Sequence, residues 1–177
     1  MLFYKLLSVL LEYPNADTYA HLDELATASD ELGLKPDERA VLRQFVAWCG
    51  EQSLIDLQAR YVETFDLTPD HSLHLTHHLF EEEDRERGIT LATLREFFVC
   101  SGFELSSNEL PDYLPLILEF VSESDDLAKA KVLLDQGQPA VVELFNRLTA
   151  SQSPLAPLLG LLQENRLPDA HVAPAIA

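Results

Sequence analysis

The side chains best suited to chemistry lie in one short segment. Four histidines, at positions 71, 74, 77 and 78, are followed by the acidic run 81–84. On a helix His71, His74 and His78 would share one face, and zinc accepts both imidazole and carboxylate ligands. The segment has neither an HExxH motif nor the paired ExxH motifs of di-iron bundles. We therefore favour a hydrated helix with partly exposed histidines, and we predict no bound metal.

Other catalytic signatures are missing from the sequence. There is no GxSxG, GxxxxGK[ST] or GxGxxG, and the six glycines form no phosphate-binding loop. Cys49 follows Trp48 on an apolar stripe, and Cys100 follows an apolar run that begins at Phe97. Both are predicted to be buried core thiols, because a nucleophilic cysteine needs an electropositive setting. We therefore predict that the protein is not an enzyme.

The composition is strongly acidic. The chain has 177 residues, with 12 Lys and Arg against 30 Asp and Glu, so its formal net charge is −18 at pH 7. This charge argues against nucleic-acid and anionic-membrane binding, and it favours either basic partners or simple solubility. The length and the 47% hydrophobic content fit one domain. We expect it over residues 1–166, followed by a loose tail over 167–177.

Apolar residues recur at helical spacing almost throughout, and no window shows sustained strand alternation. The sequence therefore predicts an all-α, single-domain bundle of many short helices. The first helix is expected to stop at Pro14. The following helix is expected to begin at Asp17 and end at Gly33, and two more should begin at Pro36 or Asp37 and at Ser53.

The second half of the chain is predicted to be helical as well. A short helix is expected over 72–80, and a long one after the run 81–87, closed by Gly102. Residues 106–109 form a capping box for the next helix, with Pro111 in its first turn and Pro115 distorting its start. Separate helices are expected from Asp125 and from Pro139, with a last apolar segment over 155–162.

The N-terminal segment is expected to be a helix and not a signal peptide. Its apolar stretch, Leu6 to Leu11, is short, and no small-residue cleavage site follows it. No run is long enough to span a bilayer. Two isolated cysteines fit a reducing compartment, so a cytoplasmic location is predicted.

Two charged or rigid segments have both a structural and a functional interpretation. The run 81–87 is either a solvated helix start or an acidic rim, with Glu82 and Glu83, that receives a basic peptide. The segment 109–115 holds two prolines around Asp112 and Tyr113. It is either a well-capped helix start or a rigid turn that holds side chains at a groove edge.

Several motifs, taken in order, resemble the nitrate reductase delta-subunit family. They are LLEYP at 10–14, YVETFD at 61–66, SLHL at 72–75, RERG at 85–88 and ELPDYLPLILEF at 109–120. Members of this family are molybdenum-cofactor assembly chaperones of respiratory nitrate reductase, within a larger group of all-helical redox-enzyme maturation chaperones. The resemblance covers roughly the first two thirds of the chain.

The resemblance implies a cytoplasmic chaperone that is not part of the final enzyme. Such a protein binds the N-terminal segment of the catalytic (alpha) subunit before its cofactor is present. It supports molybdenum-cofactor insertion and delays membrane docking. No tightly bound cofactor is implied; transient contact with the molybdenum cofactor would come through the client. A chaperone for a dimethyl sulfoxide or trimethylamine oxide reductase, and a metal-dependent helical enzyme using the histidines, remain as alternatives.

The resemblance also suggests site residues. It places Asp112 and Tyr113 at a peptide groove, with Glu109 and the arginines of the RERG motif as weaker candidates. We expect an apolar floor and an acidic rim, since the client segments of this family tend to be cationic amphipathic helices. The full set of expected peptide-binding residues is Glu82, Glu83, Arg85, Arg87, Phe97, Phe98, Glu109, Asp112, Tyr113 and Leu114.

Overall fold

All the regular elements of the described residues are helices. The structure is a computed structural model, and it describes residues 1–81, 83–105, 109–163 and 167. The elements in these ranges are α1 (Leu2–Leu11), α2 (Ala16–Ala20), α3 (Leu22–Glu31), α4 (Pro36–Gly50), α5 (Leu54–Tyr61), the π-helix η1 (Val62–Asp66), the 3-10 helices η2 (Pro69–His71) and η3 (Leu75–His78), α6 (Arg85–Cys100), α7 (Leu114–Glu123), α8 (Leu127–Ala150) and α9 (Ala156–Gly160). The predicted all-α fold is thus confirmed.

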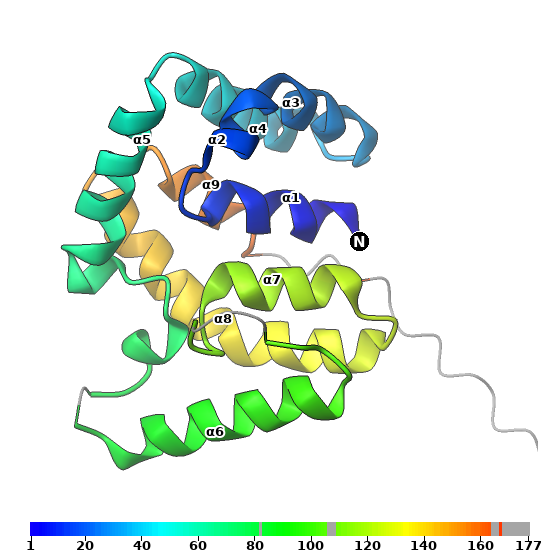
Figure 1. Ribbon diagram of the computed structural model, residues 1–177, viewed down its shortest axis with the longest axis vertical. Coiled ribbons are helices and arrows are strands. Elements are labelled where there is room, and N and C mark those ends of the chain that lie inside the picture. The colour runs from blue at the N-terminus through cyan, green and yellow to red at the C-terminus, as the bar shows by residue number, and fades with distance from the viewer. Residues whose placement is uncertain (82, 106–108, 164–166, 168–177) are drawn as a thin grey trace, which may run out of the picture.

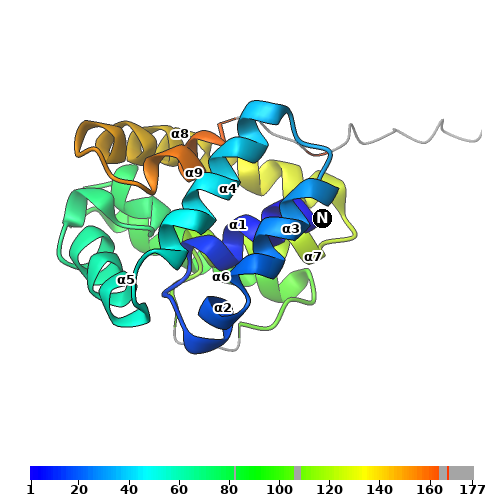
Figure 2. The ribbon, with the colours of Figure 1, turned by 90° about the horizontal axis from the view of Figure 1, so that it is seen from above.

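The N-terminal helix is the centre of the bundle. Helix α1 is apolar on most of its surface and packs along α7, with α4 above it and α8 beyond α7 (Figure 1). Its buried Ser8 donates a hydrogen bond from Oγ to the carbonyl of Pro115 at 2.8 Å. Lys5 Nζ pairs with Glu119 Oε1 at 2.5 Å. Viewed from above, α4 crosses over α1 and contacts α9 (Figure 2).

Several predicted helix boundaries are confirmed. Pro36 is the first residue of α4, and the side chain of Ser53 caps α5. Gly33 and Gly102 follow α3 and α6 with φ of +64° and +75°, which is the left-handed conformation that glycine adopts without steric cost. The predicted helix from Asp17 is instead two helices, because Asn15 caps α2 and α3 begins after a break at His21.

The helices predicted to begin near Asp125 and at Pro139 are one continuous helix, α8. A proline inside a helix lacks the amide hydrogen and is expected to interrupt it. Here buried side chains both before and after the proline, Leu133 and Leu144 among them, belong to the same core. Tertiary packing therefore outweighs the local penalty at Pro139.

The start of α7 also differs from the prediction. The helix begins at Leu114, so Pro115 lies in its first turn, where proline is tolerated, and Pro111 precedes the helix. The predicted capping box falls mainly on residues 106–108, which lie outside the described residues. The short helix expected over 72–80 is only the 3-10 helix η3, because the backbone before it pairs with residues 112–114.

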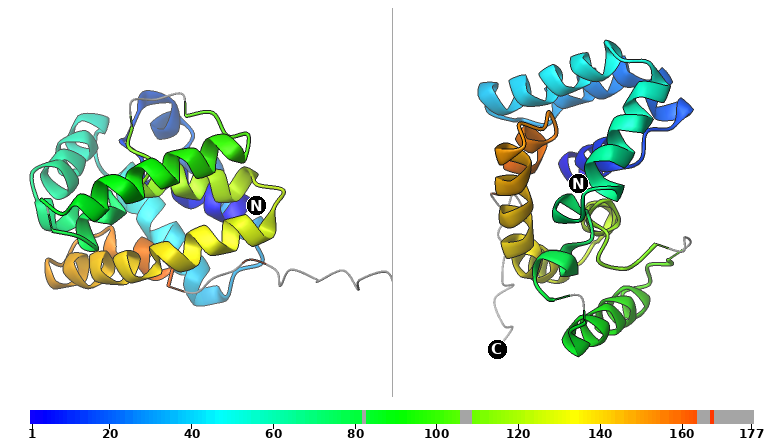
Figure 3. Two further views of the ribbon diagram at one scale, coloured as in Figure 1. Left: turned by 90° about the horizontal axis from the view of Figure 1, so that it is seen from below. Right: turned by 90° about the vertical axis from the view of Figure 1, so that its left-hand side faces the viewer.

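Helix α6 lies at one edge of the molecule, on the side of α7 opposite to α4 (Figure 1; Figure 3, left). Phe98 is the only fully buried residue of this helix, all of whose residues are described. It packs against Phe120 with ring centroids 5.0 Å apart. Cys100, in the last turn, is exposed, so its predicted burial is wrong: the core covers α6 on one side only. Cys49 is buried as expected.

The predicted tail begins at the last described residue, Leu167, which packs against the core. Residues 168–177 lie outside the described residues. The division into a domain over 1–166 and a tail over 167–177 therefore stays a prediction. Among the helices described, none is both long and apolar enough to cross a membrane.

Candidate functional site

A groove lined mainly by apolar side chains opens between α1, α4 and α5. Its cavity volume is about 50 Å³. We call it the apolar groove. Its lining residues come from the first five helices and from the start of α9: Val9, Leu10, Glu12, Pro14, Thr18, Tyr19, Leu22, Phe45, Trp48, Cys49, Leu57, Arg60, Tyr61 and Leu155.

The aromatic wall of the groove is held in place by packing and hydrogen bonds. Trp48 lies against Phe45 with ring centroids 5.5 Å apart, and the hydroxyl of Tyr19 donates to the carbonyl of Gln52 at 2.8 Å. Burial raises the pKa of the Cys49 thiol to about 12, so this thiol stays protonated at neutral pH. The groove is therefore suited to binding apolar groups and offers no activated nucleophile at Cys49.

Glu12 has a half-buried carboxylate that lines the groove beside the C-terminal end of α1. Glu12 follows the last residue of the helix, and its amide donates to the carbonyl of Ser8 at 3.1 Å. Burial raises the pKa of its carboxyl group, the charge of Glu119 raises it further, and Lys5 opposes both. Such a group is most stable beside a cation.

Two tyrosines connect the groove to the start of α7. The hydroxyls of Tyr61 and Tyr113 are 2.8 Å apart, and Tyr13 packs edge-on against Tyr61. Burial raises the pKa of both hydroxyls, that of Tyr113 to about 12, and the nearby charges of Asp66 and Glu109 add to the effect. The charge of Glu12 also raises the pKa of Tyr113. We call these three acidic residues the acidic rim: Glu12 lines the groove itself, and the charges of Asp66 and Glu109 act on the two tyrosines beside it.

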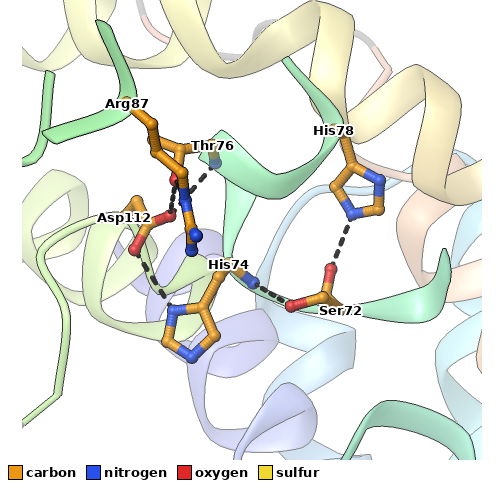
Figure 4. Close-up of polar contacts among 6 residues, drawn as sticks. All are labelled: Ser72, His74, Thr76, His78, Arg87 and Asp112. Atoms are coloured by element: carbon orange, nitrogen blue, oxygen red, sulfur yellow. Dashed lines mark hydrogen bonds and ion pairs between the residues drawn. The ribbon is translucent and has the colours of Figure 1, made fainter. Parts of the chain in front are cut away.

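Asp112, next to Tyr113 in the sequence, is the buried centre of a polar cluster (Figure 4). Its side chain has no exposed surface, yet its carboxylate accepts hydrogen bonds from Thr76, through the amide at 3.1 Å and the hydroxyl at 2.5 Å. The ring nitrogen Nδ1 of His74 lies 3.2 Å from its other oxygen. Burial acts to raise the pKa of Asp112, but the hydrogen bonds outweigh it, and the pKa is lowered.

The backbone continues this cluster. The amide of Leu75 donates to the carbonyl of Asp112 at 3.0 Å, and the amide of Leu114 donates to the carbonyl of Leu73 at 2.9 Å. His74 and Tyr113 thereby form an isolated antiparallel bridge. The segment 73–76 pairs with 112–114 and cannot be helical along its whole length. This pairing explains why the helix predicted over 72–80 shortens to η3.

The structure does not bring the predicted peptide-binding residues to one surface. Asp112, Leu114 and Phe98 are buried, so they do not line an open groove. Phe97 is half-buried and packs on Phe120 with ring centroids 5.6 Å apart. Tyr113 lies beside the apolar groove through its contact with Tyr61.

The charged candidates divide between two parts of the molecule. Glu109 is exposed and belongs to the acidic rim. Glu83 and Arg85 are exposed at the start of α6, on the far side of α7 from α4 (Figure 3, right). Arg87 is half-buried and donates from Nε to the hydroxyl of Thr76 at 3.1 Å. Glu82 lies outside the described residues.

The three histidines considered as metal ligands lie in different local structures. His71 ends η2, His74 forms the bridge, and His78 ends η3, where its Nε2 lies 2.7 Å from the carbonyl oxygen of Ser72. They therefore do not share a helical face. Within the described ranges, no three His, Cys, Asp or Glu side chains are placed to hold a metal ion.

Sequence reasoning missed the apolar groove and Glu12. The apolar stripe of α4 does not distinguish the two environments, because a helix that faces a groove has the same periodicity as one that faces a core. The sequence signal for Glu12 is its position directly after the apolar run of α1.

Comparison with known proteins gives a consistent result. The sequence profile of a family described as "Nitrate reductase delta subunit" matches residues 31–158. The probable nitrate reductase molybdenum cofactor assembly chaperone NarJ of Bacillus subtilis is 34% identical over 158 residues, 88% of this chain and 83% of that protein. The corresponding NarJ of Escherichia coli is 33% identical over 158 residues, 89% of this chain and 66% of that protein.

Proposed function

Because the chain belongs to the nitrate reductase delta subunit family, we propose that it is an assembly chaperone for a molybdenum-dependent nitrate reductase. In this role it binds the catalytic subunit before the molybdenum cofactor is present and releases it afterwards. The names of the NarJ relatives support the assembly role and the link to the cofactor. The protein itself breaks no covalent bond and is absent from the finished enzyme.

The observation that carries this proposal is the apolar groove with its acidic rim. A cationic amphipathic helix has an apolar face that fits such a groove and charged residues that fit its rim. We propose that the N-terminal segment of the catalytic subunit binds here. The net charge of −18 would also speed the approach of a cationic segment.

Holding this segment gives the chaperone control over the timing of assembly. While the N-terminus is bound, the catalytic subunit is kept from docking at the membrane, and the molybdenum cofactor can enter it. The chaperone contacts the cofactor through its client and holds no cofactor of its own. This sequence of events requires a cytoplasmic location, which the two unpaired cysteines support.

Co-purification tests the proposal. The tagged chaperone is expressed with the catalytic subunit in cells unable to make the molybdenum cofactor, and the bound proteins are identified by mass spectrometry. The full-length subunit should be retained, and a subunit that lacks its N-terminal segment should be lost. Retention of both forms would contradict binding through the N-terminus.

The same experiment separates the alternative clients. Catalytic subunits of dimethyl sulfoxide and trimethylamine oxide reductases are expressed in parallel with the tagged chaperone. Preferential retention of one of these over the nitrate reductase subunit would overturn the choice of client while leaving a chaperone role intact.

A further inference from the structure

We propose that Glu12 determines specificity in the apolar groove, by pairing with one Lys or Arg side chain of the bound segment. This inference rests on the proposed function. It adds the residue that distinguishes a cationic segment from a neutral apolar one.

The carboxylate of Glu12 is half-buried among apolar groove residues. Within the described part of the chain it has no hydrogen-bond or ion-pair partner. After burial, the charge of Glu119 is the next cause that raises the pKa of Glu12. A group in this position gains more from an incoming cation than a fully exposed carboxylate does.

The cations of the protein near Glu12 do not meet this need. Lys5 is held by Glu119 at 2.5 Å and by Glu123 at 3.5 Å. Arg60 lines the same groove, but its side chain is exposed and forms no ion pair with Glu12 in the described structure. Among the described residues no cation pairs with Glu12, so we expect a basic side chain of the bound segment to be its partner.

Binding of an apolar helix would cover Glu12 further. Covering a carboxylate without a cation is costly, because the charge loses water and gains nothing in return. Covering it with a Lys or Arg side chain makes a charge-assisted hydrogen bond instead. The groove should thus reject an apolar segment that has no basic residue at the position facing Glu12.

Intrinsic fluorescence offers a direct measurement, because Trp48 lines the groove and is the only tryptophan of the sequence. The probe is a synthetic peptide of the N-terminal segment of the nitrate reductase catalytic subunit, about 15 residues or roughly four helical turns. A companion set replaces each Lys or Arg of the peptide, one at a time, with Gln. The proteins are the full chain, Glu12→Gln, and the control Glu51→Gln, an exposed acid after α4.

Glu12→Gln should bind the unmodified peptide about tenfold more weakly than the full chain, and Glu51→Gln should bind it equally well. One of the substituted peptides should bind the full chain about tenfold more weakly than the unmodified peptide does. The same peptide should bind Glu12→Gln as tightly as the unmodified peptide binds that variant. This non-additivity identifies the pair. Urea unfolding of Glu12→Gln checks that the fold is retained.

Two other results have distinct meanings. Equal affinities of Glu12→Gln and Glu51→Gln for the unmodified peptide would overturn the role of Glu12 and leave the client-binding proposal standing. Absence of any Trp48 response and of any binding by calorimetry, with all three proteins, would overturn the proposed binding of this segment and the role of Glu12 with it.

Discussion

The carboxylate of Asp112 lies 2.5 Å from the hydroxyl of Thr76, although the aspartate side chain has no exposed surface. A buried carboxylate is tolerated when hydrogen bonds replace its water, and here Thr76 and His74 supply them. Arg87 reaches the same threonine hydroxyl from α6. Asp112 thus links the segment before α6 to the start of α7 and fixes the position of the neighbouring Tyr113.

Replacing Asp112 with alanine should destabilise the fold. The substitution leaves the Thr76 amide and hydroxyl buried without an acceptor, so the free energy of unfolding should fall by about 3 kcal/mol. Urea denaturation followed by circular dichroism measures the change. Asp125→Ala, at an exposed position, is the matched control and should lie within about 0.5 kcal/mol of the parent protein. A stable Asp112→Ala protein would show that the cluster contributes little to folding.

Loss of stability below neutral pH should depend on His78. Burial lowers the pKa of His78 from 6.5, and its Nδ1 is buried without a partner, so the neutral ring is favoured in the fold. A lowered pKa means that the unfolded chain binds the proton more readily. The stability that His78 contributes is therefore present above pH 6.5 and is lost as the pH falls towards the lowered value.

The variant His78→Gln isolates this effect. The difference in unfolding free energy between the parent and the variant should shrink as the pH falls below 6.5. His21 serves as the opposite case: its pKa is raised, first by the backbone carbonyl of Asp17, and it is fully exposed. Its small contribution should therefore be lost as the pH rises. An equal loss of stability below pH 6.5 in the parent and in His78→Gln would rule out His78 as the cause.

The sequence alone predicts the ends of those helices that are marked by local signals. Pro36, Ser53 and Gly33 mark helix ends by backbone or side-chain chemistry that does not depend on distant residues. The helix predicted over 72–80 is wrong because the segment pairs with 112–114, which is far away in sequence. The helix boundary predicted at Pro139 is also wrong, because packing on both sides of the proline maintains one helix where local rules predict two.

The peptide-binding residues predicted from the sequence do not lie together in the structure, and their role in binding stays a prediction. An apolar floor with an acidic rim was expected around residues 97–98 and 112–114. The structure has an apolar groove at α1, α4 and α5 instead, and none of the predicted residues lines it; Tyr113 reaches it only through its hydrogen bond with Tyr61. Which apolar residues face a core and which face a groove depends on how helices are arranged, and helical periodicity does not contain that information.

The two cysteines should differ sharply in reactivity. Cys49 is buried with its pKa raised to about 12, so at pH 8 only about one thiol in 10,000 is ionised. Cys100 is exposed at the end of α6. Titration with a disulfide reagent should modify one thiol rapidly in the folded protein and the second only in denaturant. The variant Cys100→Ser should show no rapid phase; a rapid phase that persists would mean that Cys49 is accessible.

Client binding should weaken as salt increases. Ion pairs at an exposed rim are screened over about 8–10 Å at physiological ionic strength, whereas apolar contacts are not. Calorimetric titration of the client peptide in low and in high sodium chloride measures the effect. A peptide with its basic residues replaced by Gln is the control and should bind weakly with little salt dependence. An affinity of the unmodified peptide that does not change with salt would contradict a role for the acidic rim.

The affinity for the client peptide should also fall at acidic pH, through Glu12. Burial raises the pKa of this carboxyl group above 4.5, and a bound cation favours its ionised form, so protonation of Glu12 opposes binding. The charged groups that act on it are Glu119 on α7 and Lys5 on α1; Arg60 on α5 shares the groove. Affinity should be constant near neutral pH and decline as the pH approaches the raised pKa. In Glu12→Gln this decline should be smaller, whereas an identical pH profile in both proteins would assign the titration to another group.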